Sequence, residues 1–271
     1  MRLTPQQMSF FETFGYIVLP GLIKDDVAWI IDAFEQVFRE RQVNHDYVRR
    51  SCVFPIIDQH EQLCTLLDHP KIDGLITSIL GEDYNYVGGD GNFYAGDTNW
   101  HSDGFHHVGR FLKVAFYLDP VKRDTGCLRV IPGTHRLDLF DAWDARRAGK
   151  AQELWGIDQK DVPAIPLESN PGDVVAFTHN LMHASFGGSS RRRMFTMNCS
   201  KHAETPEEIA DLENYINSHA RFWVDSLHSD RMRQTASPSR MRHLSQVTAH
   251  ETRLPELAAK ARRELAESSR G

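Results

Sequence analysis

The chain has 271 residues, of which 41% are hydrophobic and 25% are charged. These values are ordinary for a globular protein with its own core, and they argue against a wholly disordered chain. No apolar run reaches the length of a membrane-spanning helix, and we expect no signal peptide. The net charge of −6 argues against a general nucleic-acid surface.

The four cysteines, Cys52, Cys64, Cys127 and Cys199, are widely spaced along the chain. Because no two of them form a C-x-x-C pair, the pattern is typical of reduced thiols and not of a disulfide scaffold. We therefore expect a cytoplasmic protein.

The N-terminal part, residues 1–80, is predicted to be mostly helical. The segment from Thr4 to Gly15 has a capping box, a proline at the first helical position and a glycine stop, which together predict one helix. Apolar residues recur at helical spacing over 24–41 and again over 70–80. Residues 16–19 are predicted to form a short strand.

The middle part, residues 85–200, has short β-branched and aromatic runs that Gly, Pro, Asn and Asp interrupt. This pattern is typical of a sandwich, jelly roll or barrel. The candidate strands are 85–87, 92–94, 111–118, 127–131, 174–177 and 193–199. A polar stretch over 138–170, with Trp143, Arg146, Arg147 and Trp155, is predicted to be an insertion over one end of the barrel.

The C-terminal part, residues 205–271, returns to helix. A second capping box at Thr205 predicts a helix start, a polar segment rich in Ser, Arg and Met covers about 226–245, and 255–268 is predicted to be helical. The predicted fold class is therefore α+β, with a mainly β core flanked by N-terminal and C-terminal helices in a single domain over 1–271.

The motif with the clearest chemistry is His101-Ser102-Asp103. Residues i and i+2 of a strand point to the same side, so His101 and Asp103 can present an imidazole and a carboxylate to one point. His183 lies eighty residues after Asp103, and a Pro-Gly-Asp turn and an apolar strand precede it. Two histidines and one carboxylate form the facial triad of non-heme Fe(II) oxygenases. An H-x-D pair alone is common by chance, and His179, four residues before His183, is a less favoured ligand.

In these motifs and their order the sequence resembles the phytanoyl-CoA dioxygenase family of Fe(II)- and 2-oxoglutarate-dependent oxygenases, over roughly residues 4–200. The matching segments are 4–22, 100–104, 126–128, 131–135, 171–175, 183–185 and 191–193. The resemblance implies a double-stranded β-helix, a cupin-like jelly roll, with iron at its open end.

The resemblance also implies roles for single residues. His101, Asp103 and His183 would bind iron, and Ser185 would assist an arginine that holds the far carboxylate of 2-oxoglutarate. The segment between His183 and the arginines is about two residues shorter than usual, which leaves the choice of arginine open. Alternation along the strand puts Arg192 on one face with Thr196 and Asn198. Arg193 lies on the opposite, more apolar face. We therefore favour Arg192 over Arg193.

Three further side chains lie on strands that can face the cavity. Tyr94 and Asn92 are expected to contact the cosubstrate. Lys113 shares one strand face with Ala115 and Tyr117. If the Lys113 side chain points into the barrel it could bind an anion, and if it points outward it would only be solvated. The sequence does not decide between these two orientations.

The implied activity uses Fe(II), O2 and 2-oxoglutarate as cosubstrate, and hydroxylates or otherwise oxidises a small molecule with release of succinate and CO2. Related halogenases have a small residue in place of the carboxylate ligand, so Asp103 favours hydroxylation. Two alternatives remain: a cupin-like metalloenzyme independent of 2-oxoglutarate, and a catalytically silent ligand-binding protein. We expect no nucleic-acid or membrane partner, and a homo-oligomer stays open. Paired arginines at 49–50 and 146–147 either bind an anionic substrate or lie on the surface.

Overall fold

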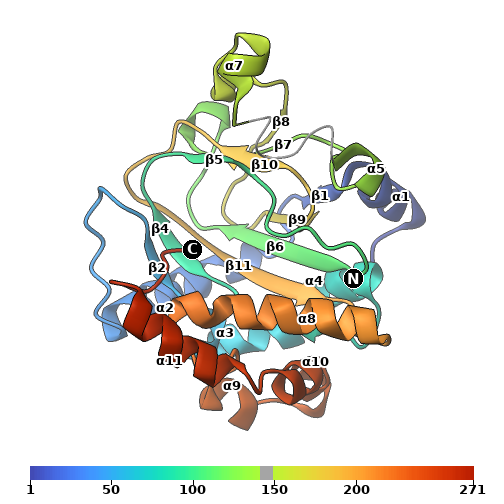
Figure 1. The fold of residues 1–271 in the computed structure, drawn as a ribbon, viewed down its shortest axis with the longest axis vertical. Helices are drawn as coiled ribbons and strands as arrows, with labels where there is room; N and C mark the ends of the chain where they lie inside the picture. Colours follow the sequence, from blue (N-terminus) through green and yellow to red (C-terminus); the bar gives the residue numbers. More distant parts are fainter. Residues whose placement is uncertain (141–148) are drawn as a thin grey trace.

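Two antiparallel sheets form the β core of the protein (Figure 1). The computed structural model describes residues 1–140 and 149–271. The larger, seven-stranded sheet has the order β1-β9-β6-β11-β4-β2, and β3 pairs with β11 beside this path. Its strands are β1 (Tyr16–Leu19), β2 (Ser51–Val53), β3 (Asn85–Tyr86), β4 (Gly91–Tyr94), β6 (Phe111–Tyr117), β9 (Val174–Thr178) and β11 (Arg192–Ser200).

The smaller sheet has the order β5-β10-β7-β8. Its strands are β5 (Thr98–His101), β7 (Leu128–Val130), β8 (Ile165–Leu167) and β10 (His183–Ser185). The antiparallel sheets and the helices around them confirm the predicted mainly β core with flanking helices.

The helices lie before, between and after these strands. They are α1 (Pro5–Phe14), α2 (Val27–Glu40), α3 (Glu61–Cys64), α4 (Pro70–Leu80), α5 (Leu137–Phe140), α7 (Ala151–Trp155), α8 (Pro206–Ser218), α9 (Asp230–Gln234), α10 (Pro238–His250) and α11 (Leu254–Glu264). The predicted capping box of α1 is present, since the Gln7 amide donates to Thr4 Oγ1 and the Thr4 amide donates to Gln7 Oε1. None of the helices in the described ranges could cross a lipid bilayer.

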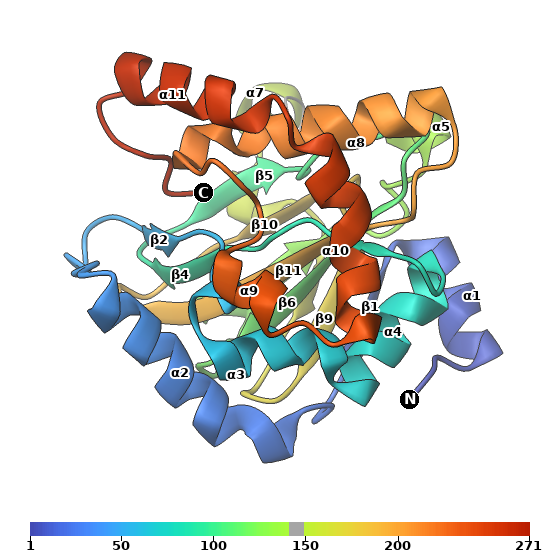
Figure 2. The same cartoon turned by 90° about the horizontal axis from the view of Figure 1, so that it is seen from below.

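The N-terminal helices cover the outer face of the larger sheet (Figure 2). One hydrophobic cluster joins Phe34 of α2 and Leu75 of α4 to Val114 and Phe116 of β6. The alternate residues of β6, from Lys113 onward, face the other way and line a cavity. This alternation follows from the two-residue period of a strand, and it makes the larger sheet a wall between core and cavity.

The C-terminal helices pack together through a separate hydrophobic cluster. It joins Leu212 and Ile216 of α8 to Val247 of α10 and Leu254 of α11, and it includes Phe111 at the start of β6. Because Phe111 belongs to the larger sheet, this contact seats α8 across the sheet at the end where His101 and Asp103 lie.

The structure departs from the sequence predictions at several places. The polar segment 226–245 contains α9 and most of α10, which begin at the N-caps Ser229 and Ser237. Helix α11 ends four residues before the predicted boundary. The strands β2, β5, β8 and β10 were not predicted, because runs of three or four residues carry little periodicity.

The predicted insertion over 138–170 contains α7 and β8, and α7 extends away from the sheets at the top of Figure 1. Trp143, Arg146 and Arg147 lie outside the described residues.

Candidate metal centre

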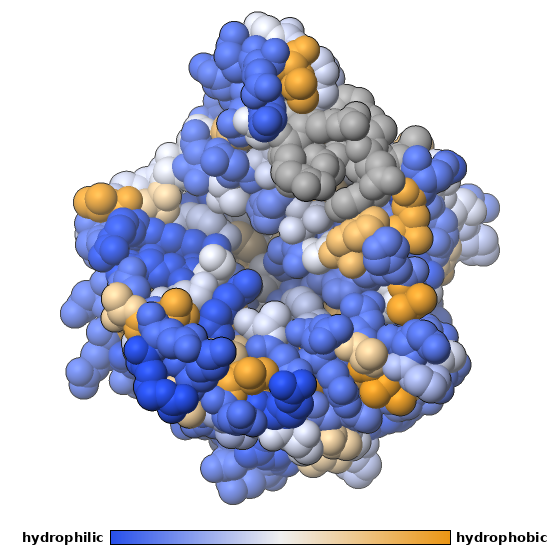
Figure 3. Space-filling model, in the orientation of Figure 1, coloured by the Kyte–Doolittle hydropathy of each residue, from blue (hydrophilic) through white to orange (hydrophobic). Residues whose placement is uncertain are grey.

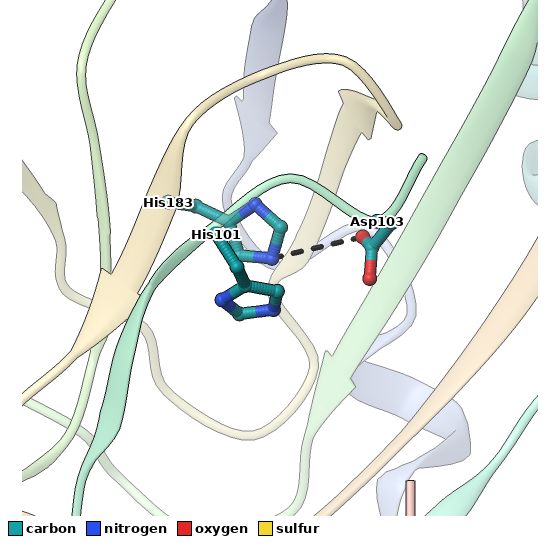
Figure 4. A group of neighbouring side chains, drawn as sticks. All are labelled: His101, Asp103 and His183. Atoms are coloured by element: carbon teal, nitrogen blue, oxygen red, sulfur yellow. Dashed lines mark ion pairs between the residues drawn. The ribbon is translucent and has the colours of Figure 1, made fainter. Parts of the chain in front are cut away.

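The two histidines of the predicted triad lie opposite each other on paired strands. His101 ends β5, His183 begins β10, and the register of these strands places the two residues side by side. Their ring centroids are 4.2 Å apart. Asp103 follows two residues after His101, and one candidate ligand atom from each of the three residues lies within 4.8 Å of the other two (Figure 4). The structure therefore brings together two imidazoles and one carboxylate.

Backbone carbonyls fix the orientation of both imidazole rings. His101 Nδ1 is 2.8 Å from the Asn99 carbonyl oxygen, and His183 Nδ1 is 2.8 Å from the Leu181 carbonyl oxygen. Because a carbonyl oxygen only accepts, each Nδ1 carries a proton, and Nε2 is the nitrogen of each ring that is left to bind a metal. Burial lowers the pKa of His183 to about 3, so the imidazole is neutral at physiological pH. This is the form that binds a metal.

Asp103 has one oxygen bound by protein and one without a partner. Lys113 Nζ donates to Asp103 Oδ1 at 2.5 Å, whereas the buried Oδ2 has no hydrogen-bond partner among the described residues. Oδ2 instead lies 3.6 Å from His183 Nε2. Burial alone would raise the pKa of Asp103, but the Lys113 ammonium and the nearby histidines outweigh it and lower the pKa, so the carboxyl is ionised.

The unpartnered oxygen tests whether these residues fit a metal ion. A buried carboxylate oxygen without a partner is costly and calls for an explanation. Here it lies beside two imidazole nitrogens with free lone pairs. Two histidines and one carboxylate are the ligand set of non-heme Fe(II) sites. The residues present fit a divalent iron ion.

The triad lies in a cavity of about 710 Å³ between the two sheets and helix α8. Figure 3 shows the molecule from the side of Figure 1, with its surface hollowed near the centre of the view. The sheet side of the cavity is lined by Tyr94, Lys113, Ser185 and Arg192 as well as the triad. A cavity of this size holds a cosubstrate together with a small substrate.

Arg192 and Arg193 point to opposite sides of β11. Arg192 is 3% exposed and lines the cavity, and its Nε and Nη1 have no hydrogen-bond partner among the described residues. Arg193 points outward and forms ion pairs with Asp119 at 2.5 Å and Glu35 at 3.0 Å. The buried Arg192 guanidinium can bind a carboxylate through its N–H donors. The charge of Arg193 is already neutralised by Asp119 and Glu35.

Ser185 and Tyr94 lie in the cavity, as expected, but Asn92 does not. Ser185 Oγ donates to the Gly126 carbonyl at 2.9 Å. The guanidinium of Arg192 lies over the Tyr94 ring, and the distance from Arg192 Cζ to the ring centroid is 4.9 Å. Asn92 is fully buried outside the cavity lining, and its amide binds the Arg50 and Asp90 side chains at 2.8 and 2.7 Å. The expected contact of Asn92 with the cosubstrate therefore has no geometric support.

His179, the less favoured ligand, lies next to the triad but outside it. Its carbonyl accepts from the Asp103 amide at 2.9 Å, which positions the H-x-D segment. Its ring is fully buried near Tyr215, with 5.2 Å between the ring centroids. His106 lines the cavity and binds Asp211 of α8 at 2.9 Å.

Helix α8 and the turn after it form a wall of the cavity, a role that the sequence did not indicate. The lining residues of this wall are Asp211, Asn214, Tyr215, Ser218, His219, Arg221 and Phe222. Those on α8 lie at positions i, i+3, i+4 and i+7, which is one face of a helix. This spacing was visible in the sequence, but nothing in the sequence indicated which element the face would cover.

Comparison with known proteins identifies the family. The family model described as "Phytanoyl-CoA dioxygenase (PhyH)" matches residues 11–195. A probable phytanoyl-CoA dioxygenase of Caenorhabditis elegans is 33% identical over 106 residues, which cover 37% of this chain and 31% of that protein. The chain thus matches about a third of the length of this curated relative.

Solved structures of similar fold have low sequence identity to this chain. The carbocyclase SnoK from nogalamycin biosynthesis, described as non-heme and α-ketoglutarate-dependent, has a TM-score of 0.57 at 21% identity, covering 73% of this chain and 84% of its own. EctD from S. alaskensis, solved with 2-oxoglutarate and 5-hydroxyectoine, has a TM-score of 0.57 at 22% identity. The match covers 73% of this chain and 76% of the EctD chain.

HygX from Streptomyces hygroscopicus, solved with nickel and 2-oxoglutarate, has a TM-score of 0.61 at 14% identity, covering 76% of this chain and 90% of its own. These likenesses show the fold, and the family match covers more than half of the chain. The chain therefore belongs to the phytanoyl-CoA dioxygenase family.

Proposed function

We propose that this protein is an Fe(II)- and 2-oxoglutarate-dependent dioxygenase that oxidises a C–H bond of a small molecule. The observation that supports the proposal is that one cavity is lined both by a possible metal-binding triad and by a buried arginine. The candidate ligand atoms of His101, Asp103 and His183 lie close together, and the buried Arg192 forms no ion pair with any of the described residues. HygX and EctD, which share the fold, have been solved with 2-oxoglutarate bound.

Each residue has a defined part in this function. His101, Asp103 and His183 would bind iron on one face and leave three positions for the cosubstrate and O2. Arg192 would bind the distal carboxylate of 2-oxoglutarate, with Ser185 and Tyr94 beside it. Bound iron and 2-oxoglutarate supply a reaction in which one oxygen atom of O2 enters succinate and the other the substrate, while 2-oxoglutarate loses CO2. The cavity walls orient the substrate and limit access of bulk water.

The test is anaerobic loading with Fe(II), followed by addition of O2 and 2-oxoglutarate. We expect succinate to form, and to form faster when a substrate is present. Zn²⁺ in place of Fe(II) should give none, because zinc has no redox chemistry. Turnover of a substrate without 2-oxoglutarate would instead indicate the cupin-like metalloenzyme. Iron binding without any 2-oxoglutarate binding would indicate a silent protein.

We expect hydroxylation and not halogenation. If His101, Asp103 and His183 all held the iron and 2-oxoglutarate bound through two atoms, one position would be left, which O2 would require, and chloride would have no place. Mass spectrometry of products formed in chloride buffer and in chloride-free buffer should show the same oxygenated product. Chlorinated product from the native protein would contradict the proposal.

The glycine at position 126 is expected to be required for cosubstrate binding. Its φ is +89°, and a Cβ there would come within 1.5 Å of Arg192 Nη1. Gly126→Ala should displace Arg192 and weaken 2-oxoglutarate binding, measured by calorimetry under anaerobic conditions. Gly96→Ala is the matched control, since Gly96 has a φ of +76° and open space around its Cβ position. Both variants should lose about 1–2 kcal/mol of stability from backbone strain. Equal 2-oxoglutarate affinity in the two variants would contradict the role of Arg192.

A cytoplasmic location and a small-molecule substrate complete the proposal. The location is supported by four cysteines that are all free thiols, three of them buried.

A further inference from the structure

Most polar side chains on the sheet side of the cavity have a partner or a role in the proposed function. The triad and Arg192 serve iron and 2-oxoglutarate. Arg50 and Asp90 form an ion pair, and Asp90 also accepts from the Thr196 hydroxyl. Lys113 and Asn198 remain, and both line the cavity.

Lys113 uses only part of its hydrogen-bonding capacity. Its ammonium has three N–H donors. Among the described residues its Nζ donates to a single acceptor, Asp103 Oδ1, and the side chain is 16% exposed. Two donors of a largely buried cation therefore remain for a partner in the cavity.

The Asn198 side chain forms no hydrogen bond with any residue of 1–140 or 149–271. The residue is 4% exposed, its Oδ1 is buried without a partner, and its amide nitrogen donates to no atom in the described parts of the chain. Because both ends of the carboxamide are free, this holds for either orientation of the amide. A buried polar group is expected to be satisfied, so the structure leaves a place for a ligand here.

The two residues lie opposite each other on paired strands. The register of β11 and β6 places Asn198 directly beside Lys113. Such cross-strand neighbours have Cβ atoms about 4.5–5.5 Å apart. Together they present a cationic donor and a neutral group that can accept or donate, separated by the width of one small polar functional group.

We propose that the substrate is a small α-amino or α-hydroxy acid, whose carboxylate binds Lys113 and whose neighbouring N–H or O–H binds Asn198. This inference rests on the proposed function and names its substrate class. A carboxylate supplies the acceptors that Lys113 lacks, and the adjacent donor satisfies Asn198 Oδ1. The exposed Arg221 at the mouth forms no ion pair with any described residue and adds positive charge on the entry side.

The position of Lys113 also limits where oxidation occurs. Its ammonium is one hydrogen bond from the candidate ligand Asp103, so an acid held there lies beside the metal. The oxidised carbon must then be only a few bonds from the carboxylate. The opposite wall is aromatic. The Phe54 ring stacks on His219 and on Phe222, with ring centroids 4.8 and 4.6 Å apart. This wall suits a compact apolar part of the substrate.

A matched panel of compounds tests the substrate class. Each α-amino and α-hydroxy acid is compared with its primary amide and with the acid that lacks the α-substituent, and acyl-CoA thioesters form the opposing class. We expect an acid to accelerate succinate formation, and its amide to lose at least about 100-fold in kcat/KM. The strongest acceleration by a thioester or an uncharged compound would overturn the inference, as would no acceleration by any acid. Anaerobic binding of 2-oxoglutarate to the Fe(II)-loaded protein, measured by calorimetry, separates this failure from failure of the proposed function.

Variants then test the two residues with the best acid. Lys113→Met should abolish the preference for the acid over its amide, in both kcat/KM and equilibrium binding, and Lys113→Arg should restore it. This ratio would not change if Lys113 only held Asp103. Asn198→Leu should lower the affinity for the acid and remove its advantage over the acid without the α-substituent. Ser245→Ala is the control, because Ser245 is exposed on α10 away from the cavity and its hydroxyl donates within its own helix. An unchanged ratio in Lys113→Met, or weaker 2-oxoglutarate binding with unchanged acid binding, would show that Lys113 contacts the cosubstrate instead.

Discussion

His183→Ala is expected to remove iron binding and with it all 2-oxoglutarate turnover. The variant leaves one imidazole and one carboxylate, a set that cannot hold iron on a face of three ligands. Loss of a residue that only orients a metal ligand typically costs about 10–100-fold in affinity, and loss of a ligand itself should cost more. Iron content after anaerobic reconstitution and gel filtration, together with succinate formation, measures both effects.

His179→Ala is the matched control for this prediction. His179 lies four residues earlier and is also fully buried, but its ring is outside the triad and its contact to Asp103 is made by the backbone. The variant should keep iron at one equivalent, even if the lost ring lowers the thermal stability. Stoichiometric iron in His183→Ala together with iron loss in His179→Ala would reverse the assignment.

The closeness of His101 and Asp103 could be predicted because the two residues are only two positions apart in the sequence. His101 ends β5 and Asp103 follows two residues later, beyond the end of the strand, so closeness in the chain and not a strand period brings them together. This held even though β5 and β10 were not themselves predicted. Their pairing places His183 opposite His101, and that register is a tertiary contact which no single strand encodes.

Features that depend on contacts between distant elements could not be predicted. Lys113 alternates with the apolar residues of β6, but only the position of the sheet in the fold shows that its face is the cavity. Asn92 is on the expected strand, yet its amide binds Arg50 and Asp90, which line the cavity in its place. Helix α8 follows the part of the chain that matches the family, and its place over the site depends on packing against Phe111.

The conformation of Arg192 is also a tertiary effect, although its strand face was predicted. Alternation along β11 put Arg192 with Thr196 and Asn198, and the structure places all three at the cavity. What the sequence did not show is why Arg193 is excluded. Asp119 follows β6 and Glu35 belongs to α2, and these two carboxylates meet at the outer face of β11 to bind it.

Arg192→Met is therefore expected to raise the KM for 2-oxoglutarate strongly while iron binding stays nearly intact. Loss of a charge-assisted contact to a carboxylate in a buried site costs about 2–5 kcal/mol, which corresponds to a factor of about 30 to several thousand in affinity. Methionine keeps an unbranched apolar stem, is shorter than arginine, and removes the charge and the donors. Arg192 is not one of the candidate iron ligands, so the iron content should match that of the native protein.

Arg193→Met provides the comparison, since it removes the same charge one residue away. It breaks the ion pairs to Asp119 and Glu35, which are partly exposed, so we expect a loss of stability of about 1 kcal/mol or less and little change in 2-oxoglutarate affinity. Calorimetric titration of 2-oxoglutarate into both Fe(II)-loaded variants under anaerobic conditions decides between the two arginines. If Arg193→Met is the variant that loses 2-oxoglutarate, the distal carboxylate does not bind at Arg192, and the free guanidinium in the cavity must have another ligand.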